Sequence, residues 1–240
     1  YHDVYATAAP TCSGITEQVS AIAMKQKLNR LIEIGFLPSD DAALRLKKVA
    51  LTLLPLIIGA AALVWGAIFF LLGRPLAGAI PMAYWVLSVG ALVYYLKTKK
   101  TAFLEYGQLL LVLVLPFLLM WSLGGFSGGS VVMIWALFAP VSALMFSEKR
   151  VALRWLLAFF ILLLISGMID DTVASAAVPL PRLARDIFYV LNLGCASAGL
   201  FLLVSYSINV EKRAIEELER AQKEVLAAKA ARPQRVFGDI

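Results

Sequence analysis

Charged residues are scarce in this sequence. Only 16% of its 240 residues are Asp, Glu, Lys or Arg, whereas soluble domains carry about 25%. Hydrophobic residues make up 61% of the chain, and its mean hydropathy is +0.82. This composition excludes an ordinary soluble enzyme, a disordered tail and a disulfide scaffold, and it indicates the lipid bilayer as the main solvent. Because one spanning helix needs about 20 residues, the length leaves room for about six spans and two polar ends.

Histidine and cysteine are also scarce. The only histidine is His2, and the two cysteines, Cys12 and Cys195, lie in very different segments. Apolar runs without histidine offer no bis-imidazole haem site, no His-x-x-x-His zinc site and no Ser-His dyad. No glycine-rich stretch carries the lysine of a phosphate-binding loop. We therefore expect no catalytic residue, no metal site and no cofactor within these 240 residues.

Six apolar runs separated by short polar stretches predict an all-α membrane protein, a six-transmembrane helix bundle within residues 45–208. Pro55, Pro116 and Pro140 lie within the first, third and fourth runs, and each is expected to kink its helix. The glycine-rich stretch 124–129 predicts a tight turn between the third and fourth runs. The expected spans are 49–72, 76–96, 102–123, 130–146, 151–169 and 187–208.

Lysine and arginine cluster at one side of the predicted membrane, which is typical of the cytoplasmic side. The net charge of +6 therefore indicates orientation in a membrane rather than nucleic-acid binding. An even number of spans places both termini on the same side of the membrane, and the basic residues make that side the cytoplasm. We therefore expect a multi-pass protein of the cell membrane. The basic side holds Arg45, Lys47, Lys48, Lys97, Lys99, Lys100, Lys149, Arg150, Arg154, Lys212 and Arg213, and the other side holds Arg74, Arg182 and Arg185.

The chain before the first span divides into two parts. Residues 1–14 are small and polar and predict a loose N-terminus. Residues 15–44 predict an amphipathic, basic cytoplasmic helix followed by the cap of the next helix. Such a helix lies on the cytoplasmic leaflet or packs on a partner subunit, and the sequence favours neither.

After the sixth span, residues 209–232 are rich in Glu, Lys, Arg and Ala, which are strong helix formers. Their apolar residues follow a heptad frame, which predicts a cytoplasmic signalling helix in a parallel coiled coil with a second copy. A solvated single helix is the alternative, although isolated helices of this length are marginal in water. The tail 233–240 is too short to be a domain. The predicted seam residues are Ile208, Ile215 and Gln222 at one heptad position and Glu211, Leu218 and Val225 at the other.

A few polar and small residues fall within the apolar runs. Glu105, near the start of the third span, is expected to pair with Lys97 or Lys100, and a proton relay is the alternative. A face of small residues in the sixth span predicts a helix–helix contact and is a candidate for the dimer seam. The members of this face are Asn192, Gly194, Ser197 and Gly199.

Charged residues also gather at the predicted outer rim, close in topology to Trp121 and Phe126. They are candidates for sensing a ligand, and ordinary solvated rim charge is the alternative. The residues are Asp170, Asp171, Arg182, Arg185 and Asp186.

The third loop and the fourth span carry a motif. Residues 123–146 read LGGFSGGSVVMIWALFAPVSALMF, a Gly-Gly-Phe turn followed by a span with Trp135 and Ala139-Pro140. This segment resembles the hexahelical membrane anchors of bacterial class III adenylate cyclases. The close of the fifth span, Ser166 to Asp170, and the charged helix after the sixth span are also similar to that family. The resemblance covers roughly residues 45–230.

The resemblance implies a homodimeric anchor whose cytoplasmic helices hold two catalytic domains together. The cyclase domain is not present in this chain, so ATP with Mg²⁺ or Mn²⁺ is implied only if such a domain follows Ile240. We expect a membrane sensor that passes a signal through the coiled coil to an output domain that makes cAMP. Its expected partners are the lipid bilayer, a second copy and a small or lipophilic ligand, but no nucleic acid. The alternatives are the input domain of a histidine kinase and a small transporter or accessory subunit of a membrane complex.

Overall fold

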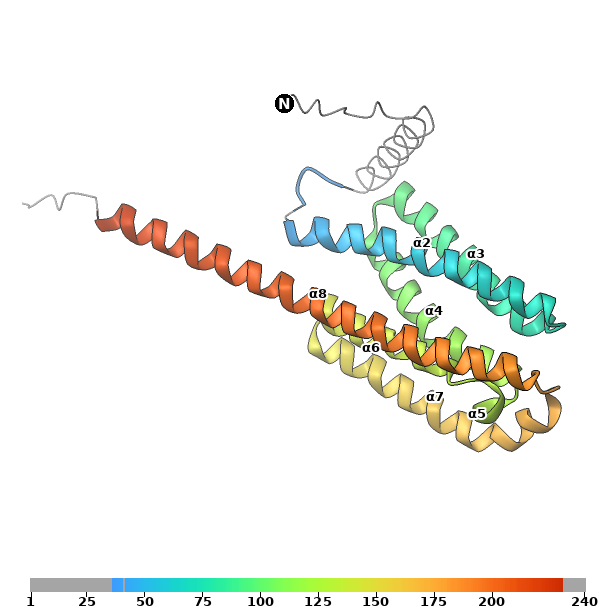
Figure 1. Ribbon diagram of the computed structural model, residues 1–240. Helices are drawn as coiled ribbons and strands as arrows, with labels where there is room; N and C mark the ends of the chain where they lie inside the picture. The colour runs from blue at the N-terminus through green and yellow to red at the C-terminus, as the bar shows by residue number, and fades with distance from the viewer. Residues whose placement is uncertain (1–35, 41, 231–240) are drawn as a thin grey trace, which may run out of the picture. The chain divides into compact units, whose positions relative to one another are not determined.

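The computed structural model describes residues 36–40 and 42–230, and within this range it contains helices and no strands (Figure 1). The predicted all-α class is therefore confirmed for these residues. The N-terminus 1–14, most of the predicted amphipathic helix and cap 15–44, and the tail 233–240 lie outside the described residues. The chain divides into two compact units, 1–111 and 112–240, and each is described by itself.

Five helices are long and apolar enough to cross a bilayer. Between 17% and 39% of the residues in their apolar windows are buried inside the protein, so most of their apolar surface faces outward. Exposed apolar surface on this scale is incompatible with water and fits lipid, which supports a helical membrane protein. The helices are α2 (Ala42–Leu71), α3 (Pro75–Thr98), α4 (Thr101–Ser122), α7 (Lys149–Ala176) and α8 (Arg182–Ala230).

The predicted fourth span differs from a regular α-helix. Residues 125–146 form the single turn α5 (Gly125–Gly128), the 3-10 helix η1 (Val132–Leu137) and the short helix α6 (Phe138–Phe146). An α-helix from residue 130 is wrong because Ser130 and Val131 have φ values of 49° and 59°, in the left-handed region where a right-handed helix cannot form. Pro140 lies in the first turn of α6, where its missing N–H removes little hydrogen bonding.

In the first unit, α2 and α3 lie side by side and are joined by a tight turn (Figure 1). Gly73 has φ +70°, and the Arg74 amide donates back to the Phe69 carbonyl at 2.9 Å, which is the bonding pattern of a glycine-terminated helix. Pro75 then begins α3, because its fixed φ suits the first position of a helix. The sequence Gly-Arg-Pro thus produces the turn between the first two predicted spans.

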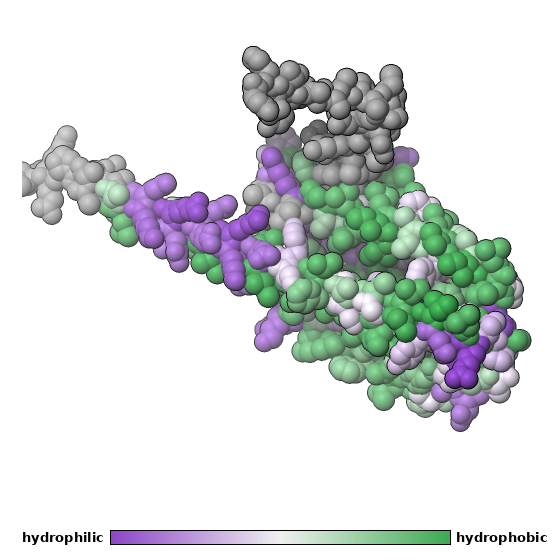
Figure 2. Space-filling view, in the orientation of Figure 1, coloured by the Kyte–Doolittle hydropathy of each residue, from purple (hydrophilic) through white to green (hydrophobic). Residues whose placement is uncertain are grey.

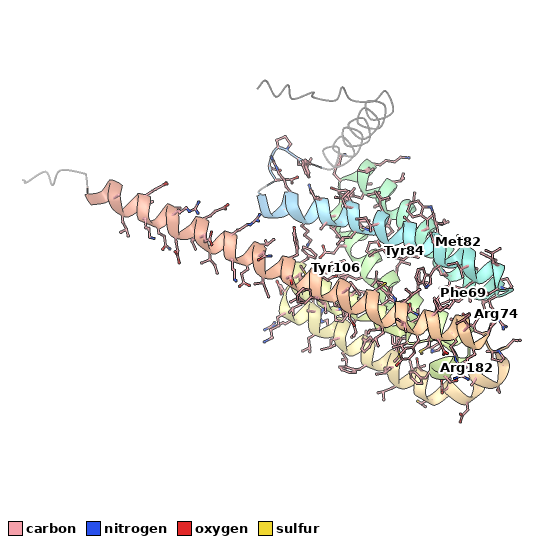
Figure 3. The ribbon with its side chains drawn as sticks, in the orientation of Figure 1. Phe69, Arg74, Met82, Tyr84, Tyr106 and Arg182 are labelled. Atoms are coloured by element: carbon pink, nitrogen blue, oxygen red, sulfur yellow. The ribbon has the colours of Figure 1, made fainter. Side chains whose placement is uncertain are left out.

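Glycines allow α2 and α3 to approach closely. A Cβ atom added to Gly66 of α2 would lie 2.9 Å from the Gly78 carbonyl oxygen of α3 and 3.1 Å from the Met82 side chain. Phe69, only 2% exposed, and Met82 lie close to this approach (Figure 3). At the other end of α3, Tyr95 and Leu104 belong to a core cluster that joins α3 to the start of α4.

The second unit packs the later half of α4, α5, η1, α6, α7 and α8. Phe117 of α4 is fully buried, and its ring lies 5.6 Å from the ring of Phe159 on α7. The helix α6 packs on α7, and η1 contacts α8. Small residues on the η1–α6 segment, Ala136 and Ala139, are completely buried, so the neighbouring helices pack directly on its backbone.

We predict that Gly66→Ala destabilises the protein although alanine is the better helix former. The added Cβ would overlap the Gly78 carbonyl oxygen, and overpacking of this kind costs about 1–3 kcal/mol, more than the roughly 1 kcal/mol that helix propensity contributes. Gly90→Ala is the matched control, because no atom lies within 4 Å of its added Cβ. Thermal unfolding in detergent should show a lower midpoint for Gly66→Ala only. Equal midpoints for the two variants would contradict the close approach.

Candidate functional site

The helix α8 is unbroken from Arg182 to Ala230, a length of 49 residues or about 74 Å. It passes through Asn209, where the composition changes from apolar to charged, without a kink residue. Its C-terminal part extends past α6 and α7, and hydrophilic side chains gather along this part (Figures 1 and 2). Every side chain from Glu211 to Ala227 is exposed. A helix of about 20 residues therefore projects from the apolar part of α8, and the described residues of the second unit do not cover it.

Asn192 bonds the apolar half of α8 to the irregular segment of residues 125–146, which we call the fourth segment. Its side chain, 2% exposed, accepts a hydrogen bond from the Trp135 indole at 3.1 Å and donates one to the Ser130 carbonyl at 3.1 Å. The Ser130 hydroxyl in turn donates to the Arg185 carbonyl of α8 at 3.1 Å. Because the left-handed Ser130 cannot bond its carbonyl within a regular helix, Asn192 supplies the partner that a buried carbonyl requires.

The predicted small-residue face of α8 separates into two sides. Asn192 and Gly199 face the fourth segment, and a Cβ on Gly199 would lie 2.8 Å from the Phe138 ring. Gly194 and Ser197 are exposed, and nothing lies within 4 Å of a Cβ added to Gly194. The first pair therefore contacts another helix within the second unit, while the second pair lies on a face that the described residues of this unit leave uncovered.

Of the predicted rim residues, Asp170 has a defined role. Its carboxylate accepts a hydrogen bond from the Phe126 amide at 2.8 Å, at the start of α5. Gly124 and Gly125 have φ values of +98° and +74°, and a Cβ on Gly125 would collide with the Asp170 carboxylate. The Gly-Gly-Phe turn thus has a physical explanation, because only glycine fits a left-handed turn pressed against a carboxylate.

The other rim charges are solvent-exposed. Arg182 lies 3.8 Å from Asp186 with side-chain exposures of 87% and 59%, and Arg185 lies 3.9 Å from the same aspartate. Pairs this long and this exposed contribute little to stability. Asp171 is also exposed. Ligand sensing by these residues stays a prediction. Asp170 differs from the other rim residues because its carboxylate accepts a hydrogen bond from the backbone.

A buried polar cluster in the first unit was missed by the sequence analysis. The hydroxyls of Tyr84 and Ser88 on α3 donate to the side-chain oxygen of Gln108 on α4 at 3.1 and 3.4 Å. All three residues are less than 8% exposed, and the Gln108 side-chain nitrogen has no partner in the part of the chain that the structure describes. The sequence signal for this cluster was Gln108, a single glutamine within an apolar run. Tyr84 and Ser88, spaced one helical turn apart in the preceding run, are its polar partners.

Two ion pairs hold the start of α2. The Asp40 carboxylate lies 2.7 Å from the Lys48 ammonium, with both side chains at most 3% exposed. The Lys47 ammonium lies 2.8 Å from the Glu105 carboxylate of α4. Glu105 thus pairs with Lys47, a partner that the sequence analysis did not consider because Lys47 lies far from Glu105 in the chain. Hydrogen bonds from Lys48 and from the Leu37 amide lower the pKa of Asp40 below its usual value.

We predict that Asn192 and Trp135 are energetically coupled. Asn192→Leu or Trp135→Phe alone leaves polar groups without a partner in an apolar surrounding, whereas the double variant removes the side-chain bond as a whole. A double-mutant cycle of unfolding midpoints in detergent should give a coupling of about 0.6 kcal/mol, the average for side-chain hydrogen bonds between membrane helices. If the effects of the two single substitutions simply added up in the double variant, the hydrogen bond between Asn192 and Trp135 would be contradicted.

We also predict that Asp40 contributes to pH-dependent stability. Because folding lowers its pKa, the stabilisation is complete above about pH 4 and is lost as the pH falls through the lowered pKa. Asp40→Asn should therefore unfold at lower temperature than the wild type at pH 7, and the difference should shrink on acidification toward pH 3. Asp171→Asn, at an exposed position, is the control for the loss of one carboxylate and should unfold at the wild-type temperature at pH 7. A constant difference between Asp40→Asn and wild type at all pH values would contradict the prediction.

No known protein family, curated protein or solved structure matches the chain. The resemblance to the cyclase anchors therefore rests on residues 123–146, the close of the fifth span and the order of the helices.

Proposed function

We propose that this chain is the membrane module of a homodimeric receptor, in which α8 carries a signal from the membrane to a cytoplasmic output domain. The observation that carries the proposal is the unbroken helix from Arg182 to Ala230, anchored at Asn192 and uncovered beyond Glu211. A helix transmits a rotation or a shift along its length because its backbone hydrogen bonds make it stiff. A break near Asn209 would have separated the two parts mechanically.

The sensing part of the proposed receptor is the irregular segment 124–135. Val131 is a β-branched residue in the left-handed region, a conformation that costs about 1–3 kcal/mol and persists only when its neighbours impose it. A small or lipophilic ligand that changes this segment acts directly on α8 through Asn192 and Ser130. Only a few kcal/mol are needed to bias two arrangements of such a module.

The proposed topology has six crossings with both termini in the cytoplasm. Residues 132–146 are apolar, and their 3-10 and α-helical parts together extend about 25 Å, close to the roughly 30 Å of a hydrocarbon core. The 3-10 turn lengthens this segment relative to an α-helix of 15 residues. The clusters of basic residues at alternate helix ends support the same orientation in the cell membrane.

The proposed output is an adenylate cyclase, in line with the motif at residues 123–146. ATP and Mg²⁺ or Mn²⁺ would then be used by the output domain and not by this module. A histidine kinase output would need the same dimeric helix, and the coding sequence after Ile240 distinguishes the two. A small transporter is the second candidate, favoured by the buried cluster of Tyr84, Ser88 and Gln108. Uptake of solute by proteoliposomes that contain only this protein would support the transporter.

We predict that single cysteines at Ile215 and Leu218 form disulfide-linked dimers in membranes, in a background in which Cys12 and Cys195 are serine. These positions occupy the seam of the predicted coil, where paired helices bring like residues together. Arg220→Cys, on the opposite side of the same helix, is the matched control. Dimer bands on non-reducing gels should be several-fold stronger at the two seam positions. Equal bands at all three positions, or none, would overturn the dimeric relay.

A further inference from the structure

The heptad frame of the cytoplasmic helix continues without interruption into the apolar half of α8. Counting backwards from Ile208 in alternating steps of four and three residues selects positions that are all exposed in the second unit. Val190 is 68% exposed and Phe201 71% exposed, although both lie among the most hydrophobic residues of the helix. The selected positions are Leu183, Ile187, Val190, Gly194, Ser197, Phe201 and Val204. Together with the predicted coil residues Ile208, Glu211, Ile215, Leu218, Gln222 and Val225, they form what we call the α8 seam.

The buried side of α8 lies opposite this seam. Phe188, Asn192 and Ala196 are at most 5% exposed, and they follow each other at one-turn spacing against the fourth segment. At about 100° per residue, this stripe and the seam positions from Leu183 to Ile215 lie on opposite sides of the helix. The second unit therefore packs on one side of α8, and its described residues leave the seam positions on the other side uncovered.

Lipid alone accounts for only part of this surface. Exposed apolar residues in the membrane half are suited to lipid, but Ile215, Leu218 and Val225 continue the same stripe where the helix is charged and faces water. Near the middle of the membrane half, the seam carries Gly194 and Ser197, small residues that allow close approach of a second helix. The occupant that matches both halves is a second copy, because it has the same repeat and the same orientation in the membrane.

We propose that two copies of α8 pack in parallel along one continuous seam from Leu183 to Val225, with their closest approach at Gly194 and Ser197. This inference rests on the proposed dimeric relay and adds the membrane contact that holds it together. In this arrangement, Asn192 and Gly199 pack within each protomer, and Gly194 and Ser197 lie at the interface between the protomers.

The test of the membrane contact is Gly194→Leu. Leucine is a better helix former than glycine, and no atom of the protomer lies within 4 Å of a Cβ added to Gly194, so we expect the fold of each protomer to be kept. The added side chain would separate the two helices, and association in lipid vesicles should weaken by about tenfold. Gly167→Leu on α7 is the matched control, since it is also exposed with no atom within 4 Å, and it should associate like the wild type.

A cysteine scan locates the seam itself. In the background without native cysteines, Val190→Cys and Phe201→Cys should cross-link strongly, and Leu202→Cys, 65% exposed on another side of α8, should cross-link weakly. Cross-linking at Ile215 and Leu218 without a maximum at the membrane positions would overturn the continuous seam and leave the relay standing. The absence of cross-linking at both sets would overturn the two proposals together. Equal weakening by Gly194→Leu and Gly167→Leu would also overturn the seam.

Discussion

A backbone that leaves regular helical hydrogen bonding in a bilayer or a protein interior must find partners within the protein, because lipid tails offer none. In this chain that requirement is concentrated between Gly124 and Leu137. Two side chains from other helices meet it: Asp170 of α7 accepts from the Phe126 amide, and Asn192 of α8 donates to the Ser130 carbonyl. The same two contacts hold α7 and α8 against the segment, so the arrangement of the second unit depends on them.

The attachment at Asn192 also determines which side of α8 is free. Once Asn192 and Ala196 face the fourth segment, the period of the helix turns Gly194 and Ser197 away from it. The helix α8 thus uses one set of residues to pack within its own protomer and a separate set for the proposed contact with a second copy. Substitutions on one side should change the fold of the protomer, and substitutions on the other should change its association, which makes the two effects separable by experiment.

The positions of the long helices could be predicted from the sequence because they depend on local properties. Apolar length defined α2, α3, α4 and α7, and the Gly-Arg-Pro turn and the basic clusters marked several ends. The unbroken course of α8 through Asn209 follows from strong helix formers beyond it. None of these features requires knowledge of which residues meet in space.

The fourth segment and the buried polar groups could not be predicted in the same way. Val131 is a residue type that avoids the left-handed region, and the carbonyl of the preceding Ser130 is bonded by Asn192, which lies far away in the sequence on α8. Gln108 meets Tyr84 and Ser88 across two helices, and Glu105 meets Lys47 across a distance in sequence that no local rule covers. The sequence analysis grouped Gly194 with Gly199 by residue type, whereas packing assigns them to opposite sides.

The two halves of the proposed α8 seam differ in what they contribute. The C-terminal half, which we propose to be cytoplasmic, carries Glu211 and Gln222 at seam positions, and polar seam residues lower the stability of a coiled coil while they fix its register. Such a coil is weak when its helices are free in solution. Contact at Gly194 and Ser197 would hold the two helices together in the membrane and raise the effective concentration of their cytoplasmic halves to the millimolar range or above. The coil would then form because the membrane half is paired, and a small change in that pairing would reach the output domain as a change in the coil.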